Sequence, residues 1–303
     1  MIKHQVKKII GWIIYLFENK SKKNFLDIFV FHEITNNPSK FQKKHKIFHK
    51  LNDFKIIIKW IAENYNIISP LEIGTIKKNS ALITFDDGYE GVFKNAIPYL
   101  LKNNIPSLHF LNMKPIIDNE PSIVSRIEFL KDKNRNFKKF LIENKIEDPI
   151  YEINPDIFKK FKESDLQDKN EIIEYQGKLV STKVLRKYSN SDLIFYGNHL
   201  YDHWNIINLN MKNIRKFYFK NKNLLKRYKN FIDIFAFTHG VPLKNFSKKN
   251  LNQILSFKPM HIFYSSGGNK KYNSKTYDRT FLTKEDIKNK IFYFRKFRAK
   301  FLF

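Results

Sequence analysis

Strand-like runs that alternate with helical segments constrain the fold of this 303-residue chain more than any other feature. Short runs rich in β-branched and aromatic residues predict strands, and apolar residues at helical spacing between them predict helices. The expected strands cover residues 25–32, 67–68, 81–85, 105–111, 193–196, 232–237, 261–264 and 277–282. The alternation predicts an α/β protein with a mainly parallel sheet. Six or seven such units indicate a barrel, in which active sites lie at the carboxyl ends of the strands.

Residues from about 113 to 190 are too many for a single connection between strands. They contain several helix-like segments, of which 125–144 and 170–188 are the clearest. We interpret them as a helical insertion that covers one face of the domain and shapes a substrate cleft, with a purely stabilising role as the alternative. Elsewhere, helices are expected at about 47–64, from about 95, and at 211–228, 251–257 and 283–293.

Two adjacent carboxylates follow the expected strand 81–85. Asp86 and Asp87 repel each other, and burial would raise the pKa of at least one of them. A divalent cation would keep one carboxylate ionised and leave its neighbour free to act as a base. The alternative is a solvated Asp-Asp-Gly turn, which is common at strand ends.

Two histidines follow the expected strand 193–196. On a helical turn, His199 and His203 would face the same way, with their Cβ atoms about 5–6 Å apart. This spacing is typical of zinc ligands, and one carboxylate with two imidazoles leaves a position open for water. The alternative is a pair of surface histidines on a polar loop. The conjunction of an acidic pair and a histidine pair, each after a strand, favours the metal site.

Both motifs resemble those of a known family. Residues 84–88, Thr-Phe-Asp-Asp-Gly, resemble the first motif of the polysaccharide deacetylases, the NodB-homology or carbohydrate esterase 4 group. Residues 197–203, which begin Gly-Asn-His, resemble the second. Shorter similarities extend the likeness over about 29–111 and from about 193 to 282. The resemblance implies a distorted (β/α) barrel of about seven strands, NodB-like, in a domain spanning 24–303 that contains the helical insertion.

The resemblance also implies an activity, the removal of N-acetyl groups from a sugar in a cell-envelope polysaccharide or lipopolysaccharide. Asp87, His199 and His203 would hold a divalent metal, with zinc as the preferred ion. Asp86 would take a proton from the attacking water. The backbone N–H of Gly240 would help to stabilise the oxyanion that develops on the acetyl group.

The chain departs from the family pattern in two places. Residues 235–240 read Phe-Ala-Phe-Thr-His-Gly and lack the arginine that orients the base in relatives, and no Leu-x-His motif supplies an acid. His239 or His32 is therefore expected to protonate the leaving amine, although His239 could instead cap its strand. Arg279 and Trp204 are predicted to bind substrate, with a surface ion pair and a core position as the respective alternatives. These departures leave open a catalytically impaired glycan-binding relic of the same fold.

The net charge of +27 raises the question of a polyanionic partner. The lysines are scattered, and no helix-turn-helix, zinc-finger or RNP-type signature is present, so we expect no nucleic-acid partner. A weak attraction to acidic glycans or lipids remains compatible with this charge. The absence of cysteine excludes disulfides and thiolate zinc sites.

Residues 1–23 combine lysines with an apolar run at 9–17. As a helix this run would be only about 14 Å long, too short for a hydrocarbon core of roughly 30 Å. The segment also lacks a small-x-small cleavage site. We interpret it as an interfacial amphipathic helix that makes peripheral membrane contact, with packing against the domain as the alternative. We expect a bacterial protein in the cytoplasm or at the periphery of the inner membrane.

Overall fold

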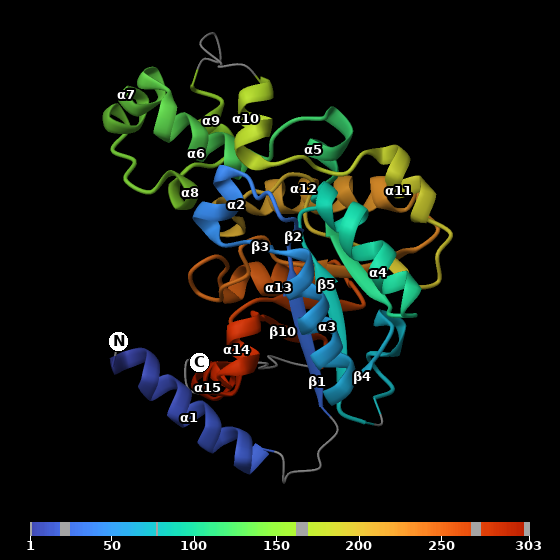
Figure 1. The fold of residues 1–303 in the computed structure, drawn as a ribbon. Helices are drawn as coiled ribbons and strands as arrows, with labels where there is room; N and C mark the ends of the chain where they lie inside the picture. The colour runs from blue at the N-terminus through green and yellow to red at the C-terminus, as the bar shows by residue number, and fades with distance from the viewer. Residues whose placement is uncertain (1, 19–24, 77, 162–168, 268–273, 300–303) are drawn as a thin grey trace.

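A parallel β-barrel forms the centre of the computed structural model (Figure 1). The structure describes all residues except 1, 19–24, 77, 162–168, 268–273 and 300–303. The barrel strands are β1 (Leu26–Phe31), β5 (Ser80–Phe85), β6 (Ser107–Leu111), β7 (Ile194–Asn198), β8 (Phe231–Ala236), β9 (His261–Tyr264) and β10 (Thr276–Phe281). Each pairs in parallel with its neighbours, and β1 closes the barrel by pairing with both β10 and β5. The predicted α/β barrel of about seven strands is confirmed.

Side chains from the seven strands alternate between two apolar environments. One buried cluster takes a residue from every barrel strand, including Ile28 of β1 and Leu82 of β5, and fills the interior. The next residues along the same strands, Phe29 and Ile83, belong to a second cluster under the surrounding helices. Burial on both faces explains why these strands read as continuous apolar runs in the sequence.

Helices α3 (Leu51–Asn64) and α4 (Ile97–Lys102) cover β1 and β5. The predicted helix 47–64 begins later than expected because β3 (Phe48–His49) pairs with β2 (Glu33–Ile34), which uses the backbone of that stretch. A π-helical turn, Val92–Ala96, precedes α4. The short strand β4 (Asn66–Ile67) lies beside the beginning of β5.

The described residues between β6 and β7 are mainly helical and lie over the carboxyl ends of the strands, in the upper part of Figure 1. Its helices are α5 (Met113–Asp118), α6 (Ile123–Lys133), α7 (Arg135–Glu143), α8 (Pro149–Glu152), α9 (Pro155–Phe158), α10 (Lys169–Gln176) and α11 (Thr182–Tyr188). The predicted helix 125–144 breaks at Asn134, whose side chain caps α7. The predicted helix 170–188 breaks at Gly177, where φ is +92°. Apolar periodicity continues through both breaks and therefore did not reveal them.

The remaining helices are α2 (Lys40–His45), α12 (Met211–Leu225), α13 (Lys248–Ser256), α14 (Lys284–Lys288), α15 (Ile291–Ala299) and α1 (Ile2–Glu18). Thr283 caps α14 as predicted, but the terminal helix expected at 283–293 is divided into α14 and α15. The division lies at Lys290, which adopts a positive φ of 57°.

Helices α1 and α15 pack together at the lower end of Figure 1. A Cβ added at Gly11 of α1 would lie 2.3 Å from the carbonyl oxygen of Lys290, so only glycine allows this approach. Lys296 of α15 pairs at 2.9 Å with Asp27, near the beginning of β1. The α1–α15 pair therefore lies toward the amino ends of the strands. Residues 19–23 of the predicted N-terminal segment lie outside the described residues.

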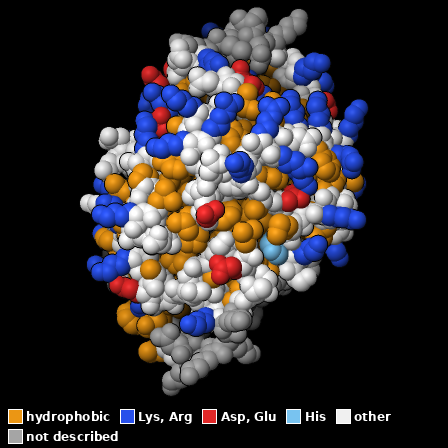
Figure 2. Space-filling model, turned by 90° about the vertical axis from the view of Figure 1, so that its right-hand side faces the viewer, with side chains coloured by type: hydrophobic (Ala, Val, Ile, Leu, Met, Phe, Trp, Pro, Cys, Tyr) orange, Lys and Arg blue, Asp and Glu red, His pale blue; other side chains and the backbone are white. Residues whose placement is uncertain are grey.

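No helix in the described part of the chain combines the length and the apolar character needed to cross a bilayer. On the face shown in Figure 2, lysine and arginine side chains are spread among hydrophobic and uncharged ones rather than gathered in one stripe.

Candidate active site

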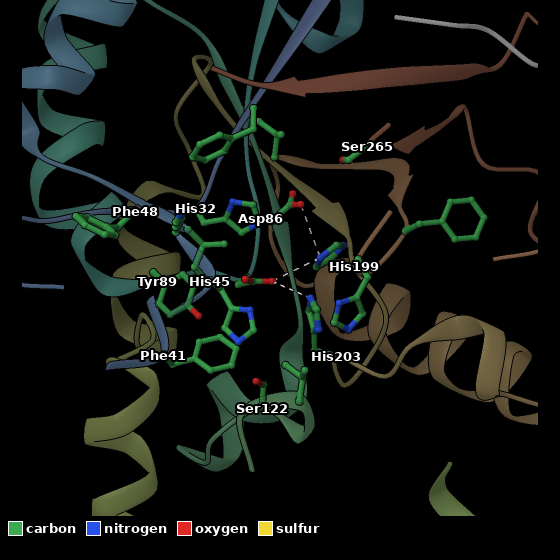
Figure 3. A pocket seen from close by; sticks show the side chains of 18 of the residues that line it. His32, Phe41, His45, Phe48, Asp86, Tyr89, Ser122, His199, His203 and Ser265 are labelled. Carbon is green, nitrogen blue, oxygen red and sulfur yellow. Dashed lines mark ion pairs between the residues drawn. The ribbon is translucent and has the colours of Figure 1, made fainter. Parts of the chain in front are cut away.

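Loops after the barrel strands converge on one cavity of about 1120 Å³. All of the residues predicted to hold metal or to take part in proton transfer line it. They are His32 after β1, Asp86 and Asp87 after β5, His199 and His203 after β7, and His239 after β8. In the view of Figure 3, Asp86 lies between His32 and His199. Convergence of this kind is expected at the carboxyl ends of barrel strands.

Asp87, His199 and His203 form a set that fits a divalent cation. The Asp87 Oδ1 atom lies 3.5 Å from His199 Nε2 and 3.2 Å from His203 Nε2. Ligand atoms at about 2.0–2.1 Å from a tetrahedral zinc ion are about 3.3 Å apart, so these distances match a shared coordination sphere. All three ligand atoms lie within 4.8 Å of one another. Asp87 Oδ1 is also buried and has no hydrogen-bond partner among the described residues, as expected of an oxygen that binds a cation.

The charges around Asp87 favour its ionised form. Burial by itself would raise the pKa of this carboxyl, but the neighbouring imidazoles of His203 and His199 hold the pKa well below its usual range. For His203, burial lowers the pKa and Asp87 raises it, with a net upward shift. In a protein without a cation, Asp87 and His203 therefore favour an ion pair. A bound cation would take the place of the histidine proton.

The two histidines lie on an irregular loop, not on the helical turn that their spacing predicted. Leu200, between them, adopts a positive φ of 63°, which brings the rings to a centroid separation of 5.2 Å. His199 Nδ1 lies 2.9 Å from the Ala236 carbonyl oxygen. When the Nδ1–H donates to this oxygen, Nε2 carries no proton and is free to bind a metal. Asp87 and His239 also have positive φ values, of 69° and 60°. Strained backbone of this kind is typical of functional sites.

Three buried asparagines, which the sequence reading missed, hold the histidine loop. Asn198 accepts a hydrogen bond from the Leu200 N–H at 3.1 Å and one from the Asn221 side chain at 2.8 Å. Asn112 donates to the carbonyl groups of His199 and Leu200. The only sequence signal for Asn221 is a polar residue on the apolar face of α12.

Arg279 is buried and binds Asp86, so the alternative of a surface ion pair is wrong. Its Nη1 and Nη2 groups donate to Asp86 Oδ1 and Oδ2 at 2.6 and 2.8 Å. The arginine is 1% exposed and Asp86 is 4% exposed, so water does not screen this pair. Burial disfavours the Asp86 carboxylate, but Arg279 and then His199 hold its pKa below the usual value. Arg279 thus orients Asp86, although the sequence reading expected it to contact substrate.

His32 and His239 follow different strands and line the same cavity. Each has one buried ring nitrogen without a hydrogen-bond partner among the described residues. Burial lowers the pKa of His32, while Asp87 and Asp86 oppose that shift. Burial and then His203 hold the pKa of His239 well below its usual value. The His239 ring lies 4.8 Å from that of His203, on the side of the metal set.

Two residues predicted to contact substrate are otherwise engaged. The Gly240 N–H donates to the Thr238 carbonyl at 2.7 Å, and a Cβ at Gly240 would meet Ser265. The structure therefore does not offer this N–H to an oxyanion. Trp204 is 6% exposed, packs against Phe158 and does not line the active-site cavity. Its position is that of a core residue, because its loop turns the indole away from His203.

The sequence model of the family described as polysaccharide deacetylase matches residues 74–255. The chain belongs to the polysaccharide deacetylase family. The match confirms the resemblance seen in the two motifs and identifies the chain as a deacetylase-type hydrolase. It includes Asp86, Asp87 and both histidines of the metal set, but it ends before Arg279.

Solved structures share the fold, and two of the three described here are named as deacetylases. IcaB from Ammonifex degensii has a TM-score of 0.58 and 14% identity, over 90% of this chain and 98% of that one. A de-N-acetylase from Aggregatibacter actinomycetemcomitans has a TM-score of 0.57 and 13% identity, over 88% and 99% of the two chains. The Streptococcus pyogenes deacetylase PplD has a TM-score of 0.56 and 12% identity, over 87% and 94%. At these identities the likeness concerns the fold alone. No curated protein sequence matches the chain significantly.

Proposed function

We propose that this member of the polysaccharide deacetylase family removes N-acetyl groups from a sugar of a cell-envelope polysaccharide or lipopolysaccharide, and that it uses a divalent cation, preferably zinc. The observation that carries the proposal is the convergence of Asp87, His199 and His203 beside a carboxylate, Asp86, that a buried arginine orients. Two imidazoles and one carboxylate suit a borderline cation such as zinc.

Asp87, His199 and His203 would hold the cation, which supplies a water of lowered pKa and polarises the acetyl oxygen. Asp86 accepts the proton of the attacking water. Arg279 occupies both oxygens of Asp86 from one side, which fixes the plane of the carboxylate and keeps it ionised. This contact replaces the arginine that is missing from residues 235–240, and it therefore favours an active enzyme over the relic.

His32 fits the role of the acid that protonates the leaving amine. Burial lowers the pKa of His32, but the negative charges of Asp87 and Asp86 oppose this shift, and its buried Nδ1 atom has no partner in the described structure. His239 was the other candidate, but it lies against His203, where a bound cation would disfavour its protonated form.

Metal analysis combined with acetate release tests this proposal. The purified chain is expected to hold about one zinc ion, and to release acetate from N-acetylated oligosaccharides such as chitin tetrasaccharide. Chelation should abolish release and zinc should restore it. A His203→Gln variant should lose both the ion and the activity. His45→Gln is the matched control, because His45 lines the same cavity but pairs with Glu128 at 2.8 Å. A chain that binds no divalent metal, or that releases acetate equally after chelation, would contradict the proposal.

We also propose that α1 docks on an anionic membrane surface, which places the protein at the membrane periphery. Its outward face exposes five large apolar side chains, at 45–61% of their area: Val6, Ile9, Trp12, Ile13 and Leu16. Exposed Lys7 adds positive charge next to this face. The opposite side of α1 packs on α15. One helix can therefore both contact a membrane and pack against the domain. Exposed apolar residues beside lysine suit a lipid headgroup region.

A vesicle co-sedimentation experiment measures this contact. An Ile9→Gln/Leu16→Gln variant should bind phosphatidylglycerol-containing vesicles at least about tenfold more weakly, since burying each side chain contributes about 1.5–3 kcal/mol. The control is Leu71→Gln/Ile142→Gln, which alters two residues that are 60% and 78% exposed on other elements. Equal loss in both variants, or a dimer that only the α1 variant disrupts, would refute lipid docking.

A further inference from the structure

A second cavity of about 560 Å³ lies between the helical insertion and α12, and the proposed reaction makes no use of it. Its size falls within the range typical of small-ligand sites. Its lining comes from five parts of the chain: Lys114 of α5, Ile123 and Arg126 of α6, four residues within 155–161 around α9, the loop after β7, and Lys216, Phe217 and Lys220 of α12.

The two cavities share two walls. On α6, Val124 and Glu128 line the active-site cavity, whereas Ile123 and Arg126 line the second one. The loop after β7 alternates in the same way. Its histidines at 199 and 203 face the active-site cavity, and its residues at 201, 202 and 204 face the second. The second cavity therefore lies directly behind two walls of the active-site cavity.

Positive charge is concentrated in the second cavity. Five of its thirteen lining residues are lysine or arginine and one is acidic, whereas the active-site cavity has three basic and five acidic residues among thirty-three. The high lysine content of the whole chain would affect both cavities alike, so it does not explain their difference in charge. Lys159, Lys216 and Lys220 form no ion pair with the residues that the structure describes. Lys216 and Lys220 are four residues apart on α12 and so lie on the same face of the helix.

Asp202 is the single acid among the described residues that line the second cavity, and it is already engaged. It accepts hydrogen bonds from Lys114 Nζ at 2.9 Å, from the Ile123 N–H at 3.1 Å and from the His203 N–H at 3.0 Å. Its charge is thus balanced by Lys114, and no other described lining residue offers an anion to Lys159, Lys216 or Lys220. Asp202 also joins α6 to the loop that carries the metal set.

Aromatic side chains provide the apolar part of the second cavity. They are Phe158, Phe161, Tyr201, Trp204 and Phe217. Lys220 lies 4.0 Å above the centre of the Tyr201 ring, which holds its ammonium group at the cavity wall. Aromatic surfaces for an apolar sugar face, together with unpaired cations for a negative group, are the chemistry that an acidic sugar requires.

We propose that the second cavity binds an anionic sugar unit, a sugar ring that carries a carboxylate or a phosphate, and that the substrate is therefore an acidic glycan. The inference that the substrate is an acidic glycan rests on the proposed deacetylase function. The inference that the second cavity binds an anionic sugar does not. Lys216 and Lys220 hold the negative group, and the half-buried rings of Tyr201 and Phe217 contact the sugar ring.

Calorimetric titration of the full chain tests the site with three probes: hyaluronan tetrasaccharide, which carries carboxylates, N-acetylglucosamine 1-phosphate, and neutral chitin tetrasaccharide. At least one anionic probe should bind tenfold or more tightly than the neutral one, and the preferred probe identifies the negative group. A Lys216→Gln/Lys220→Gln variant should abolish this preference. The matched control, Lys226→Gln/Lys229→Gln, removes the same charge from exposed positions outside the cavity and should retain it.

Equal affinity for all probes, or equal loss in the control variant, would overturn the anion site, because general surface charge would then account for the binding. Calorimetric binding and acetate release together distinguish the proposed anionic-sugar site from the proposed deacetylase function. Lysine-dependent binding without acetate release from any probe supports the site and contradicts the deacetylase function. Acetate release without a preference for anionic probes supports the enzyme and contradicts the site.

Discussion

An Asp86→Asn variant is expected to bind zinc at the stoichiometry of the unaltered protein and to release acetate about 10²- to 10⁴-fold more slowly. Asparagine keeps the size of the side chain but cannot accept a proton from the attacking water. The metal set, Asp87 with its two histidines, is untouched by the change. Acetate release measures kcat, and elemental analysis measures bound metal.

The control for Asp86→Asn is Asp27→Asn. Asp27 is also a buried carboxylate with a cationic partner, Lys296, at 2.9 Å, but it lies toward the amino ends of the strands. Both variants remove one partner of a buried ion pair and should lower the free energy of unfolding by about 3–5 kcal/mol. Only Asp86→Asn should lower kcat. Comparable catalytic loss in both variants would mean that Asp86 acts through stability rather than as the base.

An Arg279→Met variant is expected to lower kcat by about 10²-fold, with little change in KM. Methionine removes both contacts that fix the plane of the Asp86 carboxylate, and a small misplacement of a reacting group is enough for a loss of this size. An Arg279→Lys variant should recover part of kcat, because lysine keeps the charge but not the two parallel hydrogen bonds. Steady-state acetate release measures kcat and KM separately.

Lys296→Met provides the comparison for Arg279→Met, since it strips Asp27 of its cation at the other end of the barrel. Urea unfolding should show similar destabilisation for the two methionine variants. If Arg279 instead contacts substrate, as the sequence reading expected, Arg279→Met should raise KM and leave kcat nearly unchanged. That outcome would contradict the positioning role.

Local patterns accounted for much of the fold and for the metal set. Barrel strands are buried on both faces, so they read as short apolar runs, and polar residues at their ends stand out from the run. Asp86, Asp87, His199 and His203 could be found in this way because each motif is contiguous in sequence. Helix breaks such as those at Asn134 and Gly177 could not be found, because capping and positive φ there do not interrupt the apolar periodicity.

The sequence by itself determined the α/β class with a parallel sheet, through short-range periodicity, and the two contiguous motifs of the metal set, whose resemblance to a known family added the barrel. Only the tertiary structure decided that Arg279 orients Asp86, 193 residues away. That contact depends on barrel closure, which sets β10 beside β1 and β1 beside β5. The same long-range packing turned Trp204 into the core and brought scattered lysines to a second cavity. Contacts between distant segments leave no local pattern in the sequence, so these features became visible only in three dimensions.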